Sequence, residues 1–180
     1  MVLIREATPN DATQLAPLIL NAIGDIAHRL TNKDADSDAV EGLVELVQDT
    51  DNRHSYLNTY VAELDDQVVG MIVLYDGLTG NKLDALHAKK YNIQIDVEAH
   101  NDEFYIDTVS VLPSAQGKGV GSRLLQFAEE KAKEKGFSKL SLNVEIEKTN
   151  AQKLYERLGF VITEPWTIID EPFHHMVKMI

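Results

Sequence analysis

The sequence predicts a mixed α/β protein whose central sheet has about seven strands and about four flanking helices. Short runs rich in β-branched and aromatic residues indicate the strands, and apolar residues at helical spacing indicate the helices between them. A tight hairpin in the first half and two consecutive strands at the end of the chain require antiparallel neighbours. The sheet is therefore expected to be mixed rather than wholly parallel.

The first half of the chain is expected to hold three strands and two helices. The expected strands are Val2–Arg5, Tyr60–Leu64 and Val68–Tyr75. The first helix is expected to begin after the N-cap Thr8, to continue to Ile26 and to be kinked by Pro17. The second amphipathic helix is expected at Ser37–Gln48.

The second half alternates strands and helices after one long polar segment. Residues 76–102 are expected to be irregular, with room for a short helix around Leu83–Lys90. A connection this long is either a cap over a binding site or a surface excursion. Further helices are expected from Val120, ended by Gly136, and at Thr149–Leu158. The expected strands are Glu103–Leu112, Leu140–Ile146, Phe160–Ile168 and Phe173–Met179.

Composition narrows the function classes. The chain has 180 residues, and residues 1–180 are expected to form a single domain. The formal net charge of −12 disfavours nucleic acid and anionic membrane as partners. The chain has no cysteine, which excludes disulfides, thiolate metal sites and cysteine nucleophiles. Neither a signal peptide nor an apolar run of about 20 residues is recognisable, so a cytoplasmic location is expected.

A glycine-rich loop precedes the helix at Val120. In the stretch PSAQGKGVGSRLL, residues 113–125, glycine occupies positions 117, 119 and 121. Glycine lets a ligand approach the backbone closely, and the unpaired N–H groups of a helix start favour an anion such as a phosphate. The spacing fits neither a Walker loop nor the dinucleotide fingerprint well, and a tight turn that needs glycine is the alternative.

Several motifs in order resemble the GNAT superfamily of N-acetyltransferases. Gln116–Gly121 resembles the Q-x-x-G-x-G signature, and AQKLYERLGF at residues 151–160 resembles the A-x-x-L-Y-E-x-x-G-F segment. FYIDTVSVLP before the loop looks like the central strand of the family, and IREATPNDA looks like its first strand and helix start. The resemblance covers nearly the whole chain and implies the GNAT-like acyl-CoA N-acyltransferase fold.

The resemblance also implies acetyl-CoA as the co-substrate and names the residues that bind it. The strand before the loop and the strand after its helix are expected to splay apart, so that the pantetheine arm pairs with the backbone of Val109 and Val111. Where the family often has asparagine, seven residues before the motif tyrosine, this chain has Lys148, and the nearest asparagine is Asn150. The loop residues implied to bind the pyrophosphate are Gln116, Gly117, Lys118, Gly119, Val120, Gly121 and Ser122.

Acetyl transfer to an amine requires a deprotonated amine, a stabilised carbonyl oxygen and a protonated leaving thiolate. The resemblance makes Tyr155 the candidate acid, with an aromatic anchor as the structural alternative. Asp107 ranks first as the base, because a carboxylate in an otherwise apolar strand is costly unless it has a function or a partner. Glu103 and Glu145 are alternative bases, and water chains without a single base are another. A backbone N–H near Val109 would serve the carbonyl oxygen.

The sequence leaves the amine acceptor open. A small-molecule or peptide amine is expected, and the acidic joint Asp34, Asp36 and Asp38 favours a cationic one, although a solvated acidic turn is the more common case. Part of this joint, with Glu45, matches a calcium loop, but the residues after it have the pattern of a helix that Asp36, Ser37 or Asp38 would cap. No metal site is therefore expected.

The sequence thus predicts an N-acetyltransferase that transfers acetyl from acetyl-CoA to a primary amine. Without cysteine to carry an acyl group, direct attack in a ternary complex is the expected route. A non-catalytic acyl-CoA-binding or sensor domain is one alternative, and a nucleotide- or calcium-binding domain is another. Members of the family are often dimers, so a homodimer is also open.

Overall fold

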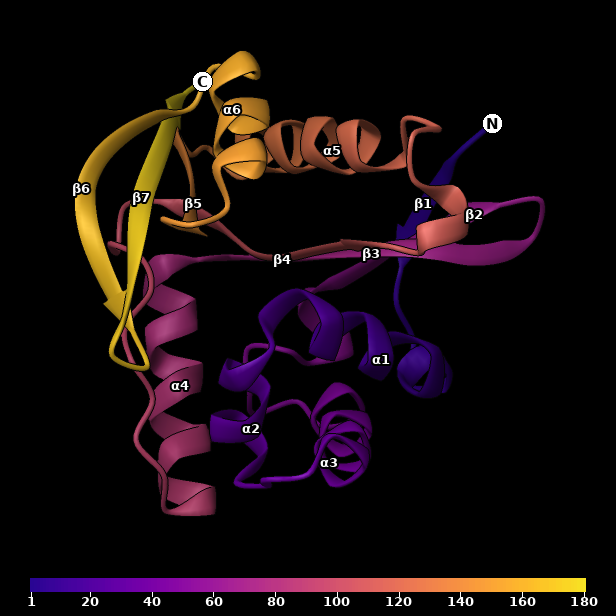
Figure 1. Cartoon of the computed structure of the whole chain (residues 1–180), viewed down its shortest axis with the longest axis vertical. Helices are drawn as coiled ribbons and strands as arrows, with labels where there is room; N and C mark the ends of the chain where they lie inside the picture. The colour runs from indigo at the N-terminus through magenta and orange to yellow at the C-terminus, as the bar shows by residue number, and fades with distance from the viewer.

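Seven strands form one sheet in the computed structural model, which describes residues 1–180 (Figure 1). The strands are β1 (Leu3–Glu6), β2 (Thr59–Leu64), β3 (Gln67–Asp76), β4 (Phe104–Val111), β5 (Lys139–Glu145), β6 (Val161–Ile168) and β7 (Glu171–Met179). Their order is β1-β2-β3-β4-β5-β7-β6. Only β4 and β5 run parallel, and all other neighbours are antiparallel. The predicted mixed sheet of seven strands is therefore confirmed.

Six α-helices cover the sheet, two more than the sequence predicts. The helices are α1 (Ala12–Ile23), α2 (Asp25–Thr31), α3 (Asp36–Gln48), α4 (Gly77–Tyr91), α5 (Val120–Glu134) and α6 (Thr149–Arg157). In Figure 1, α1, α2 and α3 lie on one side of the sheet, and α5 and α6 lie on the other. None of these helices has the length and apolar character that a membrane span requires.

The central strands supply side chains to a separate core on each face of the sheet. On β3, Met71 and Val73 belong to the core beneath α1, α2 and α3. Ile72 and Leu74, which alternate with them, belong to the core beneath α5. Successive side chains of a strand point to opposite faces, so a strand covered on both sides must be apolar throughout. This double coverage explains the continuous apolar run in β3.

The segment 76–102 is more regular than the sequence analysis predicts. Its first part is α4, a helix of 15 residues, and the expectation of an irregular segment is wrong there. The carboxylate of Asp76 caps the helix by accepting a hydrogen bond from the Thr79 N–H at 2.9 Å. The buried residues of α4 are two glycines and His87. Because the helix buries no apolar stripe, periodicity could not reveal its length.

The long first helix of the prediction is divided into α1 and α2. The helix continues through Pro17, where a kink was expected, and the division lies at Gly24, whose φ is +51°. The start of α3 also differs from the prediction. Its N-cap is Ala35, and no side chain caps it, so the expected cap by Asp36, Ser37 or Asp38 is wrong. The proposed calcium-loop residues from Asp36 onward are helical.

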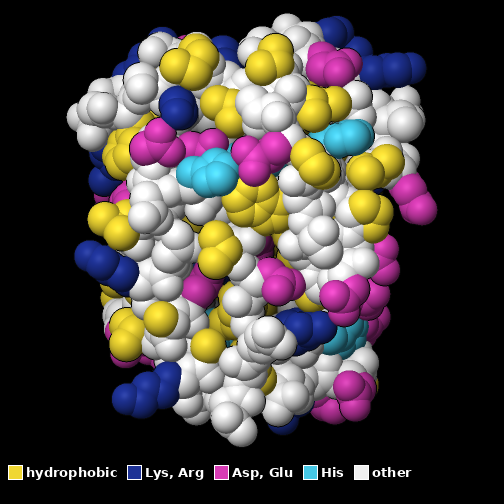
Figure 2. All heavy atoms as spheres, turned by 90° about the vertical axis from the view of Figure 1, so that its left-hand side faces the viewer, with side chains coloured by type: hydrophobic (Ala, Val, Ile, Leu, Met, Phe, Trp, Pro, Cys, Tyr) yellow, Lys and Arg dark blue, Asp and Glu magenta, His cyan; other side chains and the backbone are white.

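Strand β6, beside β7, is one of the two edge strands of the sheet, the other being β1. It exposes Val161 and Ile162, and it carries Pro165, a residue that edge strands tolerate because it cannot donate to a ladder. The view toward β6, β7 and α4 (Figure 2) shows acidic, basic and hydrophobic side chains mixed over this face.

Candidate active site

Strands β4 and β5 pair only where they begin. The paired residues are Phe104 to Ile106 on β4 and Leu140 to Leu142 on β5. Beyond them, β4 continues to Val111 and β5 continues to Glu145 without pairing to each other. The predicted splay of these two strands is confirmed, and it opens the sheet at its centre.

A cavity of about 250 Å³ lies at this opening. Asp107 and Val109 line it from β4, Asn143 and Glu145 line it from β5, and Tyr155 lines it from α6. Burial raises the pKa of the Tyr155 phenol above its ordinary value. The structure therefore brings together the predicted acid, the first-ranked base and one of the two predicted backbone positions.

The glycine-rich loop lies between the end of β4 and the start of α5. Gly117 and Gly119 have φ values of +76° and +81°, the left-handed region that favours glycine. No other atom lies within 4 Å of where a Cβ would be at either position. The amides of residues 117–122 donate to no backbone acceptor, and the first bond at this end of α5 is from Arg123 N to Gly119 O at 3.0 Å. These donors and this open space suit an anion.

Some predicted residues lie outside the cavity. Asn150 is exposed at the second position of α6 and does not line the cavity, whereas Lys148 does. Val111 is the last residue of β4, and its carbonyl oxygen accepts a hydrogen bond from Gln116 Nε2 at 3.4 Å. Glu103 is buried behind the cavity, with Oε1 2.9 Å from Nε2 of His175.

Asp107 has many partners. Its side chain is 2% exposed, with Oδ2 3.1 Å from Arg53 Nε and Oδ1 3.1 Å from His54 Nε2. The hydroxyls of Tyr75 and Thr108 also donate to this carboxylate. Burial alone would raise the pKa of Asp107, but the facing cationic groups and donors lower it well below its ordinary value. A carboxylate held so firmly in its ionised form is a weak proton acceptor.

Arg53 is the centre of a cluster that the sequence analysis missed. The guanidinium, in a side chain 2% exposed, contacts three carboxylates, of Asp84, Glu98 and Asp107. Arg53 precedes β2, Asp84 lies on α4, and Glu98 lies between α4 and β4. No local pattern marks a buried arginine in a polar stretch. The length of the segment 76–102 was the only signal that pointed toward Glu98.

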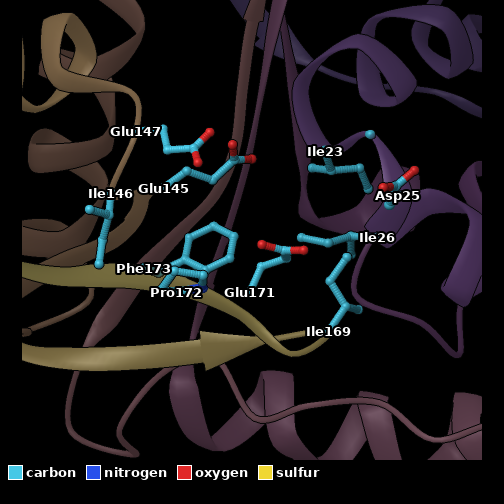
Figure 3. A pocket seen from close by; sticks show the side chains of 11 residues that line it. Ile23, Asp25, Ile26, Glu145, Ile146, Glu147, Ile169, Glu171, Pro172 and Phe173 are labelled. Atoms are coloured by element: carbon cyan, nitrogen blue, oxygen red, sulfur yellow. The ribbon is translucent and has the colours of Figure 1, made fainter.

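A second cavity, of about 290 Å³, adjoins the first and shares four lining residues with it: Ile23, Ile26, Glu145 and Phe173. Four carboxylates line it and no lysine or arginine does; they belong to Asp25, Glu145, Glu147 and Glu171. Figure 3 shows Glu145 and Glu147 on one side, Asp25 on the other and Glu171 between them. The remaining side chains are apolar, among them Ile23, Ile26 and Ile169.

The acidity of this cavity comes from other residues than the sequence analysis expects. Asp34, Asp36 and Asp38 line neither of the two adjoining cavities. Asp36 instead lies 2.9 Å from His28 Nε2 at the joint between α2 and α3. The acidic joint therefore does not line these two cavities. The carboxylates of the second cavity lie at and just after the end of β5, at the start of β7 and at the start of α2.

Comparison with solved structures supports the same fold. An N-acetyltransferase from Staphylococcus aureus Mu50 aligns with a TM-score of 0.85 at 25% identity, over 97% of this chain and 99% of that chain. Another acetyltransferase aligns with a TM-score of 0.79 at 30% identity, over 98% of each chain. A streptothricin acetyltransferase of Bacillus anthracis, solved in complex with acetyl coenzyme A, aligns with a TM-score of 0.51 at 25% identity, over 68% of this chain and 61% of that chain.

Curated relatives match a shorter part of the chain. Mycothiol acetyltransferase of Renibacterium salmoninarum is 36% identical over 70 residues, which are 39% of this chain and 20% of the relative. GCN5-related N-acetyltransferase 6 of Arabidopsis thaliana is 34% identical over 70 residues, 39% of this chain and 24% of the relative. The match thus spans about a quarter or less of these relatives. The model of the acetyltransferase (GNAT) family matches residues 26–160. The chain belongs to the GNAT family of acetyltransferases.

Proposed function

We propose that this protein transfers the acetyl group of acetyl-CoA to a primary amine, by direct attack of the amine in a ternary complex. The observation that supports the proposal is the opening between β4 and β5. The cavity at this opening is lined by Tyr155 of α6 and by residues of β4, the strand that leads into the glycine-rich loop. Family membership and the acetyl coenzyme A complex of the Bacillus anthracis neighbour support acetyl-CoA as the co-substrate.

The loop supplies the binding site for the pyrophosphate of this co-substrate. Its six amides from Gly117 to Ser122 have no backbone acceptor, and they belong to the loop and first turn of α5, where the helix dipole favours negative charge. Lys118 adds a positive charge within the loop. Acetyl-CoA supplies an acetyl group activated as a thioester. Val109 and Val111 lie on the part of β4 that pairs with β3 but not with β5, so the edge of β4 that faces β5 is open to the pantetheine arm.

Tyr155 is the proposed acid for the departing thiolate. A phenol is protonated at neutral pH, burial raises the pKa of Tyr155 further, and the residue lines the cavity. We assign Asp107 a positioning role in place of the proton transfer expected from the sequence, because its ionised form is stabilised by Arg53, His54 and Tyr75. It fixes the guanidinium of Arg53 at the inner wall of the cavity.

The acidic cavity supports a cationic acceptor. Its four carboxylates would attract an ammonium group, and its apolar side chains would cover the carbon chain between two charges. A small molecule or peptide with a second positive charge fits this lining best. A cytoplasmic location and a homodimer stay predictions from the sequence.

The first experiment measures thermal unfolding with acetyl-CoA, ATP, NAD and calcium in parallel. A ligand at a hundred times its dissociation constant stabilises by about 2.7 kcal/mol, a shift of roughly 5–10 °C for a chain of this size. A shift with acetyl-CoA alone is expected. Thiol release is then followed with a panel of amines, and the cysteine-free protein contributes no thiol background. No shift at saturating acetyl-CoA would contradict the proposal, and binding without turnover of any amine would favour an acyl-CoA sensor.

A further inference from the structure

Glu98 occupies the inner wall of the cavity between the splayed strands. It belongs to the segment between α4 and β4, is 6% exposed and lines the same cavity as Tyr155. Its Oε1 accepts a hydrogen bond from the hydroxyl of Tyr105 at 2.8 Å. Its Oε2 is ion-paired with Nη2 of Arg53, but this contact is not aligned as a hydrogen bond. Oε2 is therefore fully buried and keeps a lone pair that no hydrogen-bond donor occupies.

The charges around Glu98 do not balance. One guanidinium, of Arg53, faces three carboxylates, and Asp107 and Asp84 each contact it beside Glu98. His54 faces Asp107 rather than Glu98. A buried cluster with more carboxylates than cations favours protonation of one of its members. Asp107 has the strongest set of donors, which stabilise its ionised form, so another carboxylate of the cluster binds the proton.

We propose that Glu98 is the catalytic residue that accepts the proton of the acceptor ammonium, with Arg53, Tyr105 and Asn143 as its positioning residues. The inference rests on the proposed function. Glu98 takes the role of the base because Asp107, whose ionised form is strongly stabilised, is a weak proton acceptor. Where carboxylates share one site and their environments push their pKa values apart, they commonly have different roles in acid–base catalysis.

The protons of the reaction balance with this assignment. The acceptor ammonium loses one proton to the carboxylate of Glu98, which lines the cavity, and the amine nitrogen then forms the new C–N bond as the C–S bond breaks. Tyr155 gives its hydroxyl proton to the departing sulfur and regains a proton from the second N–H of the nitrogen. The net release is one proton, which Glu98 passes to solvent through the cavity before the next turnover.

The electrostatic environment of Glu98 agrees with this role. Burial and the repulsion of Asp107 and Asp84 outweigh the attraction of Arg53 and raise the pKa of Glu98 to about 7. The donor hydroxyl of Tyr105 opposes the shift in part by stabilising the ionised form. A base whose pKa lies near the working pH is ionised in a useful fraction of molecules and still binds the proton firmly.

Neighbouring side chains hold Glu98 in place. Asn143 Nδ2 donates to the main-chain oxygen of Glu98 at 2.8 Å and to the Tyr105 hydroxyl at 3.1 Å. The Asn143 side-chain oxygen lies 2.6 Å from Nδ1 of His175. The segment between α4 and β4 is thereby fixed to β5 and β7, although it contains no regular structure of its own.

The test compares wild type with Glu98→Gln and with Tyr105→Phe, using Glu134→Gln on the exposed end of α5 as the control. In wild type, kcat/KM is expected to fall as the pH is lowered, with an apparent pKa near 7 for this acid limb of the pH profile. Glu98→Gln is expected to lose about 10²–10⁴-fold in turnover and to lose this acid limb, while acetyl-CoA affinity is unchanged. Tyr105→Phe removes a donor to the carboxylate, so the acid limb moves to higher pH. Glu134→Gln leaves the profile unchanged.

A titration of side-chain carboxyl ¹³C signals adds a readout that does not depend on activity. One signal with a midpoint near 7, absent from Glu98→Gln, is expected. Wild-type turnover without an acid limb near 7, or a Glu98→Gln variant that keeps both rate and limb, would overturn the assignment of Glu98 and leave the acetyltransferase proposal intact. A wild-type protein that binds acetyl-CoA but acetylates no amine would overturn both.

Discussion

Replacing Arg53 by methionine removes the one guanidinium that faces three buried carboxylates. Methionine keeps most of the volume of the stem, so the main change is the loss of charge. Removing one partner of a buried ion pair costs about 3–5 kcal/mol, because the opposite charge stays buried without compensation. Arg53→Met is therefore expected to lower the free energy of unfolding by about that amount at pH 7. Since native proteins have about 5–15 kcal/mol in total, the loss is large but measurable.

The pH dependence of this loss tests its cause. Without Arg53, the folded-state pKa values of Glu98 and Asp84, which are already raised, rise further, and the lowered pKa of Asp107 rises toward its unfolded value. The folded variant therefore binds more protons than folded wild type. A carboxylate with a raised folded pKa costs stability as pH rises from its unfolded pKa toward its folded pKa. For each additional proton that the folded variant binds, its free energy of unfolding falls by about 1.4 kcal/mol more per pH unit. The difference between variant and wild type is therefore expected to be smaller at pH 5 than at pH 8, because the contribution of Asp107 is lost at both pH values and those of Glu98 and Asp84 grow as pH rises.

Denaturant unfolding at pH 5, 6, 7 and 8 measures the effect. Arg123→Met is the matched control, because Arg123 pairs with Glu130 at 3.4 Å and both side chains are more than a third exposed. Such a surface pair contributes under about 1 kcal/mol. An Arg53→Met loss that is equal at pH 5 and pH 8 would refute the reasoning, since it would show that the guanidinium does not keep these carboxylates ionised.

Three further predictions concern the site. Gly119→Ala strains a left-handed position in the loop and is expected to weaken acetyl-CoA binding about tenfold by calorimetry, whereas Gly136→Ala, equally strained at φ +80° but at the far end of α5, should leave affinity unchanged. Tyr155→Phe should lower turnover by about 10²–10⁴-fold in a thiol-release assay while keeping acetyl-CoA affinity, and an unchanged rate would remove Tyr155 from the mechanism. Replacing Glu147 and Glu171 together by glutamine should raise KM for a diamine more than for a monoamine, and the difference should shrink at high salt; equal effects on both amines would contradict the cationic acceptor.

Local sequence patterns were sufficient to predict the features that depend only on residues close together in the sequence. The seven strands, the helix that begins at Val120 and the left-handed glycines of the loop follow from alternation, helical spacing and the conformational freedom of glycine. The loop and Tyr155 could be recognised because a motif places them at fixed distances along the chain. The splay of β4 and β5 followed from the same resemblance, and the strand register bears it out.

Other features depend on contacts between distant residues, which no local pattern reveals. The helix α4 buries two glycines and a histidine in place of an apolar stripe, so only its packing shows its length. Asp107 looks like a free carboxylate in an apolar strand until Arg53 and His54, 54 and 53 positions earlier, are seen to neutralise it. The sequence alone determined the mixed seven-stranded sheet and the glycine-rich loop before α5. The tertiary structure decided the charge state of the inner wall, because burial and the summed field of residues from four separate segments set which carboxylate can take a proton.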